Sequence, residues 1–243
     1  MNKLLAFTKL SVCLVTTGTL LLVFSSCEYF DSKRLLVVFV DASQSTIQDR
    51  DAYRHYLHEF ADQLKPGDRL FVFIISDQTR FSRTPVIKVE LPSYDPISGK
   101  EHEFKKSLAA KRQQLRAEID SVMSVLGQSK WTEILDCFKL AAQYFSNSPS
   151  EKILVIMSDM VESNPQEDWE YRLPDTNSIK TKYKNYLTNL IDAKIIVAGA
   201  GSRNHDSARS FVIERFWQAF IAETGAKLLA YSQGFTIDSL GGD

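Results

Sequence analysis

The sequence predicts an α/β fold in which a mainly parallel sheet is doubly wound, with helices on both of its faces. Two patterns support this prediction. Short, continuous apolar runs recur along the chain, as expected of strands that are buried on both faces. Between these runs, apolar residues recur at every third or fourth position, which is typical of helices with one buried side. Strands and helices that alternate in this way form parallel βαβ units, as in Rossmann-like domains.

The composition fits a globular domain that does not bind nucleic acid. Of the 243 residues, 44% are hydrophobic and 24% are charged, which supplies enough apolar material for a core. Basic and acidic residues nearly balance, at 29 and 30, so the formal net charge is -1. Because nucleic-acid binding requires a basic surface, this balance argues against a nucleic-acid partner.

Residues 1–27 have the pattern of an export signal. Lys3 and Lys9 precede an apolar run that extends from residue 10 to residue 24, and this segment contains no acidic residue. The run is short for a membrane-spanning helix, which needs roughly 20 apolar residues. We therefore expect the chain to be exported to a membrane of the cell envelope, with its folded domain facing the periplasm or the exterior.

Cys27 is a candidate lipidation site. The sequence Ser25-Ser26-Cys27 is similar to the lipobox of bacterial lipoproteins, although that pattern prefers Leu where this chain has Phe24. A lipid on Cys27 would anchor the domain to a membrane. Ordinary cleavage of the signal, or an N-terminus that stays as an uncleaved anchor, are the alternatives.

The first part of the domain is predicted as strand, helix, strand and strand. Continuous apolar residues predict strands at 35–40 and 70–75, and a shorter strand at 86–91. Apolar residues at helical spacing predict a helix over 53–64, between the first two strands. The sequence Lys-Pro-Gly at 65–67 ends that helix.

The middle of the domain is predicted to be mainly helical. Helical spacing predicts a long helix over 104–126 and a second helix over 134–145, before a strand at 153–157. A polar stretch without periodicity follows at 163–179. Three apolar residues at helical spacing then predict a helix over 183–190.

The last part of the domain is predicted as strand, helix and strand. The strands are expected at 195–198 and 227–231, and the helix between them at 211–220. Together the elements define three segments after the signal: a linker at 28–33, a domain at 34–231 and a flexible tail at 232–243.

Acid and hydroxyl side chains follow the first strand at every second position, as Asp41, Ser43 and Ser45. In open parallel sheets, ligands bind beyond the carboxyl ends of the strands. Alternate residues leaving a strand point the same way, so these three side chains can converge on one point. They offer oxygen ligands without thiol or imidazole, which suits Mg²⁺.

Two further motifs complete a resemblance to a known family. Thr132 opens a predicted helix, and Asp159 follows the strand at 153–157. With the D-x-S-x-S motif, they make the chain resemble a von Willebrand factor type A domain that has a metal-ion-dependent adhesion site. The resemblance covers about residues 34–231. The family often has Gly beside its Thr and after its Asp, where this chain has Trp131 and Met160.

The resemblance implies a metal site and a function in binding. By resemblance, Ser43, Ser45 and Thr132 bind a metal ion directly, whereas Asp41 and Asp159 act mostly through waters. The expected ion is Mg²⁺, with Mn²⁺ or Ca²⁺ as alternatives. Because neutral oxygens neutralise the ion poorly, we expect a Glu or Asp of a protein partner to fill its open position. The chain would thus be a membrane-tethered adhesion or assembly module.

Each candidate site residue also has a simpler interpretation. Asp41 and Thr132 could cap helices, and Asp159 could form a turn. Glu162, in the same loop as Asp159, is interpreted mainly as a solvated acid. For Thr132, the role of helix cap and the role of metal ligand are compatible.

Trp169 and Tyr171 are candidate partner-binding residues in the polar stretch at 163–179. Aromatic residues in such loops are common at protein interfaces. The alternative is that the loop folds its aromatic residues back onto its own domain. Because this stretch follows Asp159 closely, we expect it to lie near the same edge of the sheet.

Two other functions remain open on the sequence alone. The domain could be a metal-independent structural component of an envelope complex. It could also be a phosphate or ester hydrolase that uses Asp41 or Ser43 as nucleophile, although no motif places a His near either residue. We therefore expect no enzymatic activity and assign no catalytic residue.

Overall fold

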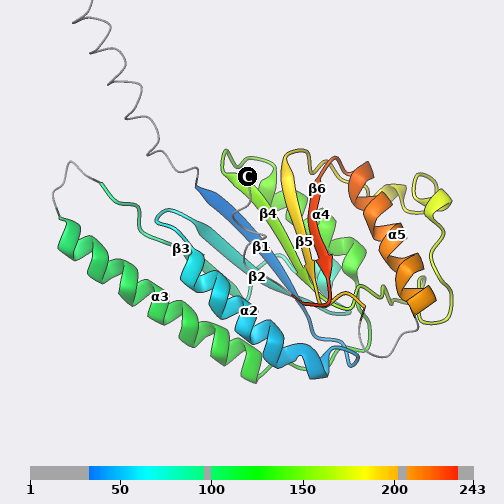
Figure 1. Ribbon diagram of the computed structural model, residues 1–243, viewed down its shortest axis with the longest axis horizontal. Helices are drawn as coiled ribbons and strands as arrows, with labels where there is room; N and C mark the ends of the chain where they lie inside the picture. Colours follow the sequence, from blue (N-terminus) through cyan, green and yellow to red (C-terminus); the bar gives the residue numbers. More distant parts are fainter. Residues whose placement is uncertain (1–32, 96–99, 202–206, 235–243) are drawn as a thin grey trace, which may run out of the picture. The chain divides into compact units, whose positions relative to one another are not determined.

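The computed structural model describes residues 33–95, 100–201 and 207–234. These residues form a six-stranded sheet with the order β3-β2-β1-β4-β5-β6 (Figure 1). All neighbouring strands are parallel except β3, which is antiparallel to β2. The strands are β1 (Arg34–Asp41), β2 (Arg69–Ile75), β3 (Ile87–Glu90), β4 (Glu151–Met157), β5 (Ala193–Ala198) and β6 (Lys227–Ser232).

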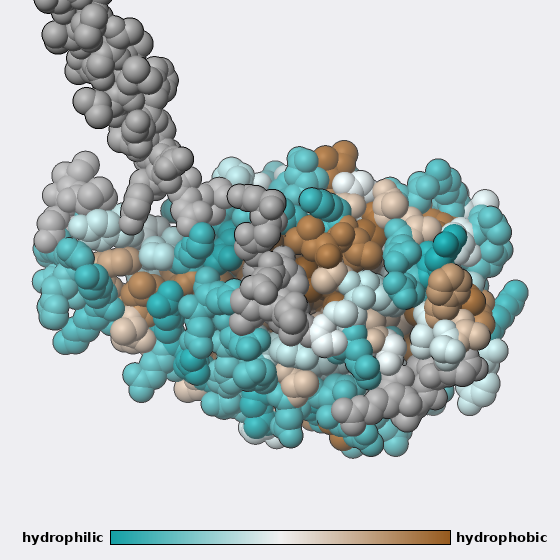
Figure 2. Space-filling view, in the orientation of Figure 1, coloured by the Kyte–Doolittle hydropathy of each residue, from teal (hydrophilic) through white to brown (hydrophobic). Residues whose placement is uncertain are grey.

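Helices cover both faces of this sheet, which confirms the predicted fold class. One core contains the odd-numbered residues Val37 and Phe39 of β1, and the other contains the even-numbered Leu36 and Val38. The first core packs against α4 (Ile134–Phe145) and α5 (Ser207–Glu223), and the second against α2 (Arg50–Gln63) and α3 (Glu101–Ser124). Figure 1 shows α2 and α3 in front of the sheet. Hydrophilic residues dominate their outer surface in Figure 2.

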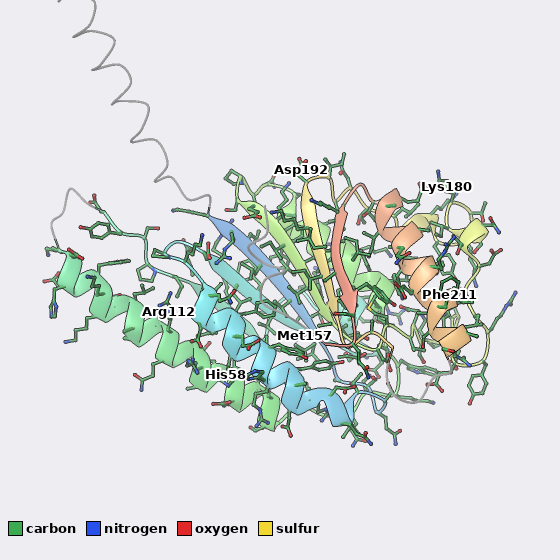
Figure 3. The ribbon with its side chains drawn as sticks, in the orientation of Figure 1. His58, Arg112, Met157, Lys180, Asp192 and Phe211 are labelled. Carbon is green, nitrogen blue, oxygen red and sulfur yellow. The ribbon has the colours of Figure 1, made fainter. Side chains whose placement is uncertain are left out.

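Strand β1 has the central position that its composition predicts. All eight of its residues are buried, and the strand lies between β2 and β4. The chain leaves β1 toward β2 on one side and reaches β4 on the other, so the topological switch point lies between β1 and β4. The carboxyl ends of both strands meet at one edge of the sheet, which Met157 marks in Figure 3. Ligands of doubly wound sheets bind at this kind of edge.

The helix predicted over 183–190 is wrong. This region contains only a short 3₁₀ helix, η6 (Lys184–Tyr186). The ring of Tyr183 packs edge-on against Phe216, and the amide of Leu190 donates to the carbonyl of Thr224. Contacts with the rest of the domain therefore decide the path of this segment. The other 3₁₀ helices are η2 (Ile47–Asp49), η3 (Thr79–Phe81) and η5 (Thr176–Ser178).

A buried ion pair lies at the opposite, amino-terminal edge of the sheet. Arg34 begins β1, and Asp68 precedes β2. The Asp68 Oδ2 atom accepts from Nε and Nη2 of Arg34, at 2.8 and 2.6 Å, and from the amide of Lys65 at 2.8 Å. The Asp68 Oδ1 atom accepts from the amide of Arg34 at 2.8 Å. Every oxygen of this buried carboxylate is thus hydrogen-bonded, and its charge is paired.

The predicted export signal at 1–27 and the lipidation site Cys27 lie outside the described residues. The same is true of most of the linker at 28–33 and of the tail at 232–243. Among the helices that the structure describes, none combines the length and the apolar character that a membrane crossing requires.

Candidate metal centre

The turn after β1 is organised by the side chains of Asp41 and Thr46. The Asp41 Oδ1 atom accepts from the amide of Ser43 at 2.7 Å. The hydroxyl of Thr46 lies 3.1 Å from the carbonyl oxygens of both Asp41 and Ser43 and can donate to them. These bonds curl the chain just beyond the sheet. As a result, the hydroxyls of Ser43 and Ser45 lie 3.0 Å apart.

The turn after β4 meets the turn after β1. Ser158 donates its hydroxyl to Asp41 Oδ2 at 2.6 Å, and Ser45 donates its hydroxyl to Asp159 Oδ2 at 2.6 Å. The Asp159 Oδ1 atom accepts from the amide of Val161 at 3.0 Å. Four of the five predicted metal-site residues are therefore linked by hydrogen bonds across the switch point. Ser158 was missed by the sequence analysis, although its place directly after a buried strand is a usable signal.

Thr132 reaches the same edge through its backbone. Its amide donates to the carbonyl of Ser163 at 2.8 Å, and the amide of Ser163 donates back to the carbonyl of Thr132 at 3.0 Å. Nearby, the amide of Ser129 donates to the carbonyl of Ala42 at 2.9 Å. The segment before α4 is thus paired with both strand-end turns. Among the described residues, no hydrogen bond joins the Thr132 hydroxyl to the other four predicted metal-site residues.

Glu162 is buried and not solvated, contrary to the interpretation from sequence. Its Oε2 atom accepts from the amides of Ile134 and Leu135, at 2.8 and 2.9 Å, and its Oε1 atom accepts from Asn164 Nδ2 at 2.7 Å. The carboxylate therefore caps the first turn of α4, immediately after Thr132. Burial raises the pKa of Glu162 to about 8 despite these hydrogen bonds.

The electrostatics of the centre favour an added cation. Burial is the main cause that raises the pKa of Asp41 to about 7, and the negative charge of Asp159 raises it further. Hydrogen bonds from Ser158 and Ser43 act in the opposite direction. Within the described ranges, no Lys or Arg forms an ion pair with Asp41. A divalent cation would favour the ionised carboxylates that burial opposes.

A buried tyrosine borders the centre on the side of α2. The hydroxyl of Tyr53 is buried and has no hydrogen-bond partner within the described structure. The negative charges of Asp41 and Asp159 add to the burial that raises the pKa of Tyr53. Gly199, which has φ +95°, gives this hydroxyl room, because a Cβ at that position would collide with it.

The available donor atoms fit a hard divalent ion. The centre offers carboxylate and hydroxyl oxygens, which are the ligands of Mg²⁺, Mn²⁺ and Ca²⁺. Within the described residues, no group of three or more His, Cys, Asp or Glu side chains is placed to bind a metal, at this edge or at any other. A metal ion at this edge would therefore depend on two carboxylates completed by hydroxyls.

Met160 adopts an unusual backbone conformation directly after Asp159. Its φ of 65° lies in the left-handed region, which favours glycine. The side chain of Met160 is fully buried, and its carbonyl accepts from Trp217 Nε1 at 2.8 Å. The tight turn that presents Asp159 is thus held by packing, by the bond from Trp217 and by the bonds that the amides of Met160 and Val161 donate to Ser158 and Asp159, without the glycine common in the related pattern.

The two aromatic residues of the loop at 163–179 have opposite environments. Trp169 is completely buried, with its ring against Phe216 and Trp217, so it offers no surface to a partner in this structure. Its role is to fix the loop onto α5. Tyr171 is 88% exposed. Of the two candidate partner-binding residues, only Tyr171 remains available for contact.

Comparisons with known proteins give no function for this chain. No family model matches the chain. No curated protein matches it either. Solved structures similar to it include an aerotolerance-related membrane protein from Bacteroides fragilis, with 14% identity and a TM-score of 0.42 over 83% of this chain and 92% of that chain. Another is the conserved hypothetical protein BatB from Bacteroides thetaiotaomicron, with 12% identity and a TM-score of 0.43 over 86% and 94%.

A third similar structure is the manganese-loaded TRAP protein from Plasmodium vivax. It has 11% identity and a TM-score of 0.43, over 75% of this chain and 62% of that chain. Similarity at this level concerns the fold alone, and the fold assignment rests on the strand order and the helix placement described above. The sheet order and the two helical layers are those of a von Willebrand factor A-type fold, as the sequence predicts.

Proposed function

We propose that this chain is a binding module that recognises a protein partner through a bound divalent metal ion. One observation carries the proposal. The carboxylates of Asp41 and Asp159 and the hydroxyls of Ser43 and Ser45 form one hydrogen-bonded cluster at the switch point of the sheet. Such a cluster, at the usual ligand-binding edge of a doubly wound sheet, supports a Mg²⁺ site.

The residues of the cluster have distinct roles in the proposed site. The hydroxyls of Ser43, Ser45 and Thr132 would bind the ion, and Asp41 and Asp159 would hold its waters. Asp41 also sets the turn that aims Ser43, through the bond to its amide. When bound, the ion supplies a position that an anionic ligand can fill. We propose that a Glu or Asp of a protein partner fills it, which makes a contact rather than a reaction.

We further propose that the module is held at a membrane of the cell envelope. The support is the sequence of residues 1–27, which has the pattern of an export signal and ends in Cys27. A lipid at Cys27 would leave the domain free to present its metal edge to a partner. Mass spectrometry of the chain purified from membranes tests this point, because acylation adds a defined mass at Cys27.

Calorimetric titration of the full chain with MgCl₂ tests the metal site. We expect saturable binding at about millimolar concentration or tighter, and loss of this binding in Asp41→Ala. Asp77→Ala is the matched control, because Asp77 follows β2 at the same edge but lies outside the proposed ligand set. Titrations with MnCl₂ and CaCl₂ define the preferred ion. Equal heats for the wild type and Asp41→Ala would contradict the metal site.

The exposed Tyr171 favours a second candidate function, in which the loop alone binds a partner. A pull-down from membranes separates the two candidates. A metal-dependent contact is lost on chelation of divalent ions and in Asp41→Ala. A contact made by the loop alone survives chelation and is lost in Tyr171→Ala.

A further inference from the structure

A polar cavity of about 400 Å³ lies beside the metal edge, between η3 and α4. Its lining includes three basic side chains, Arg80, Arg83 and Lys139, and a single acid, Asp136. The volume is within the range of roughly 300–1,000 Å³ that is usual for ligand sites. The excess of positive charge indicates an anionic ligand.

The three basic side chains differ in how far they are already paired. Lys139 lies 3.2 Å from Asp136 Oδ1 and 4.0 Å from the centre of the Tyr186 ring. Arg80 lies 3.6 Å from Glu133 Oε1. The exposed Arg83 is bound through its backbone carbonyl, which accepts from Tyr144, and its guanidinium has no ion pair or hydrogen bond within the described part of the chain. Arg83 is therefore the group most available to a ligand.

The chemistry of the cavity fits a carboxylate better than a phosphate. A planar guanidinium donates two parallel hydrogen bonds to a carboxylate. A phosphate dianion carries twice the charge of a carboxylate, so it would be repelled more strongly by Asp136, which pairs with Lys139. The ring of Tyr186 and the side chain of Leu140 add apolar surface to the lining. Such a mixture suits an amino-acid side chain of a peptide.

The cavity and the proposed metal site are linked through the segment that begins α4. Glu133, which accepts from the amide of Arg80 at 3.3 Å, directly follows Thr132 in the chain. Both walls of the cavity begin at the metal edge, because η3 follows β2 and α4 follows Thr132. A segment bound at the metal edge can therefore extend along the surface into the cavity.

We propose that this cavity binds a second acidic side chain of the same protein partner, so that the partner is recognised through an acidic segment. This inference rests on the proposed function for the identity of the partner. The metal edge takes one carboxylate, and Arg83, with help from Arg80 and Lys139, takes another. The spacing of two acids, rather than one carboxylate alone, then selects the partner.

Fluorescence anisotropy of a labelled hexaglutamate peptide with the full chain tests the proposal. We expect Arg83→Gln to weaken binding about tenfold, the usual effect of losing a hydrogen bond to a charged group. Lys139→Gln removes a second basic side chain of the cavity, and its peptide affinity is measured in the same way. Lys106→Gln is the matched control, because it removes one exposed positive charge from α3, on the other face of the sheet. Thermal unfolding checks that each variant is folded.

The outcomes separate the cavity from the metal site. An equal affinity of Arg83→Gln and Lys106→Gln would overturn the cavity proposal. If Mg²⁺ and Asp41→Ala have no effect while the Arg83→Gln loss persists, the cavity binds acidic peptides and the proposed metal function fails. Competition at equal ionic strength compares glutarate with inorganic phosphate. Stronger displacement by glutarate supports carboxylate recognition, and stronger displacement by phosphate overturns it.

Discussion

Two buried carboxylates at opposite edges of the same sheet differ in their hydrogen bonds and in their ion pairing. Asp68, at the amino-terminal edge, receives four hydrogen bonds and is paired with Arg34. Asp41, at the carboxyl-terminal edge, is completely buried, and within the described part of the chain it receives hydrogen bonds from Ser43 and Ser158 alone. The fold can neutralise an acid next to β1, as it does at Asp68. Among the described residues, no cationic side chain pairs with Asp41, which supports the proposal that this edge receives a cation from outside.

The largest effect is expected from breaking the paired edge. Asp68→Ala leaves the buried Arg34 without its counter-charge, which costs about 3–5 kcal/mol of the free energy of unfolding. Urea denaturation measures this loss. Calorimetry with MgCl₂ is the control, and any protein that remains folded should bind the ion as the wild type does. A loss below about 1 kcal/mol, which is typical of an exposed ion pair, would show that the Arg34–Asp68 pair contributes little and would contradict the contrast drawn between the two edges.

A smaller effect on stability is expected at Glu162, a third buried acid. Its carboxylate accepts hydrogen bonds from backbone amides and has no cationic partner in the described structure. Glu162→Ala leaves the amides of Ile134 and Leu135 without their acceptor, which costs about 1–3 kcal/mol of unfolding free energy. Mg²⁺ binding should weaken as well, because Thr132 adjoins the loosened turn. Glu162→Gln keeps one acceptor oxygen and should lose less. Equal stability of Glu162→Ala and the wild type would show that the cap is unimportant.

The smallest effect, with the opposite sign, is expected at Asp41. Burial raises the pKa of Asp41 from its ordinary 3.8 to about 7, so the folded chain holds a proton that the unfolded chain releases. The stability of the metal-free chain should therefore be highest at acidic pH and fall as the pH rises through about 7. A shift of this size is worth about 4 kcal/mol at pH above 7. The Asn side chain has one acceptor oxygen in place of the two that now accept from Ser43 and Ser158, which offsets much of this gain. Asp41→Asn should therefore flatten the fall and gain roughly 1 kcal/mol at about pH 7.5 without metal.

Denaturation of both proteins in chelator, across this pH range, measures the Asp41 effect. The stability of Asp41→Asn should still fall in part as the pH rises, because Glu162 also has a raised pKa, of about 8, and loses its proton over the same range. Added MgCl₂ should stabilise the wild type and leave Asp41→Asn unchanged. A variant that loses stability at neutral pH in chelator would show that the Asp41 charge is already compensated.

The sheet was predictable from sequence because its strands are short, continuous apolar runs. The run at 35–40 lies within a strand that is buried on both faces, and its buried surroundings leave little freedom for another structure. The helix expected over 183–190 was wrong, because three apolar residues at helical spacing cannot show that Tyr183 packs against Phe216. Contacts made far along the chain decide such a segment.

The candidate site was predictable where alternate residues leave a strand, as Asp41, Ser43 and Ser45 do. The parts that sequence missed depend on side-chain direction in a turn. Glu162 lies three residues after Asp159, and its spacing does not show that it points back to the start of α4. Trp169 occurs in a polar run, and only the fold reveals that its ring enters the core.

The bond from Trp217 to the carbonyl of Met160 gives the domain a built-in optical reporter. The indole is buried on α5 and stacks on Phe138, and its N–H ends one residue from Asp159. Any shift of the Asp159 turn must lengthen this bond or displace the ring, and either event changes the surroundings of the chromophore. The tryptophan emission of the unlabelled chain, to which Trp131 and Trp169 also contribute, can thus follow events at the carboxyl-terminal edge in real time.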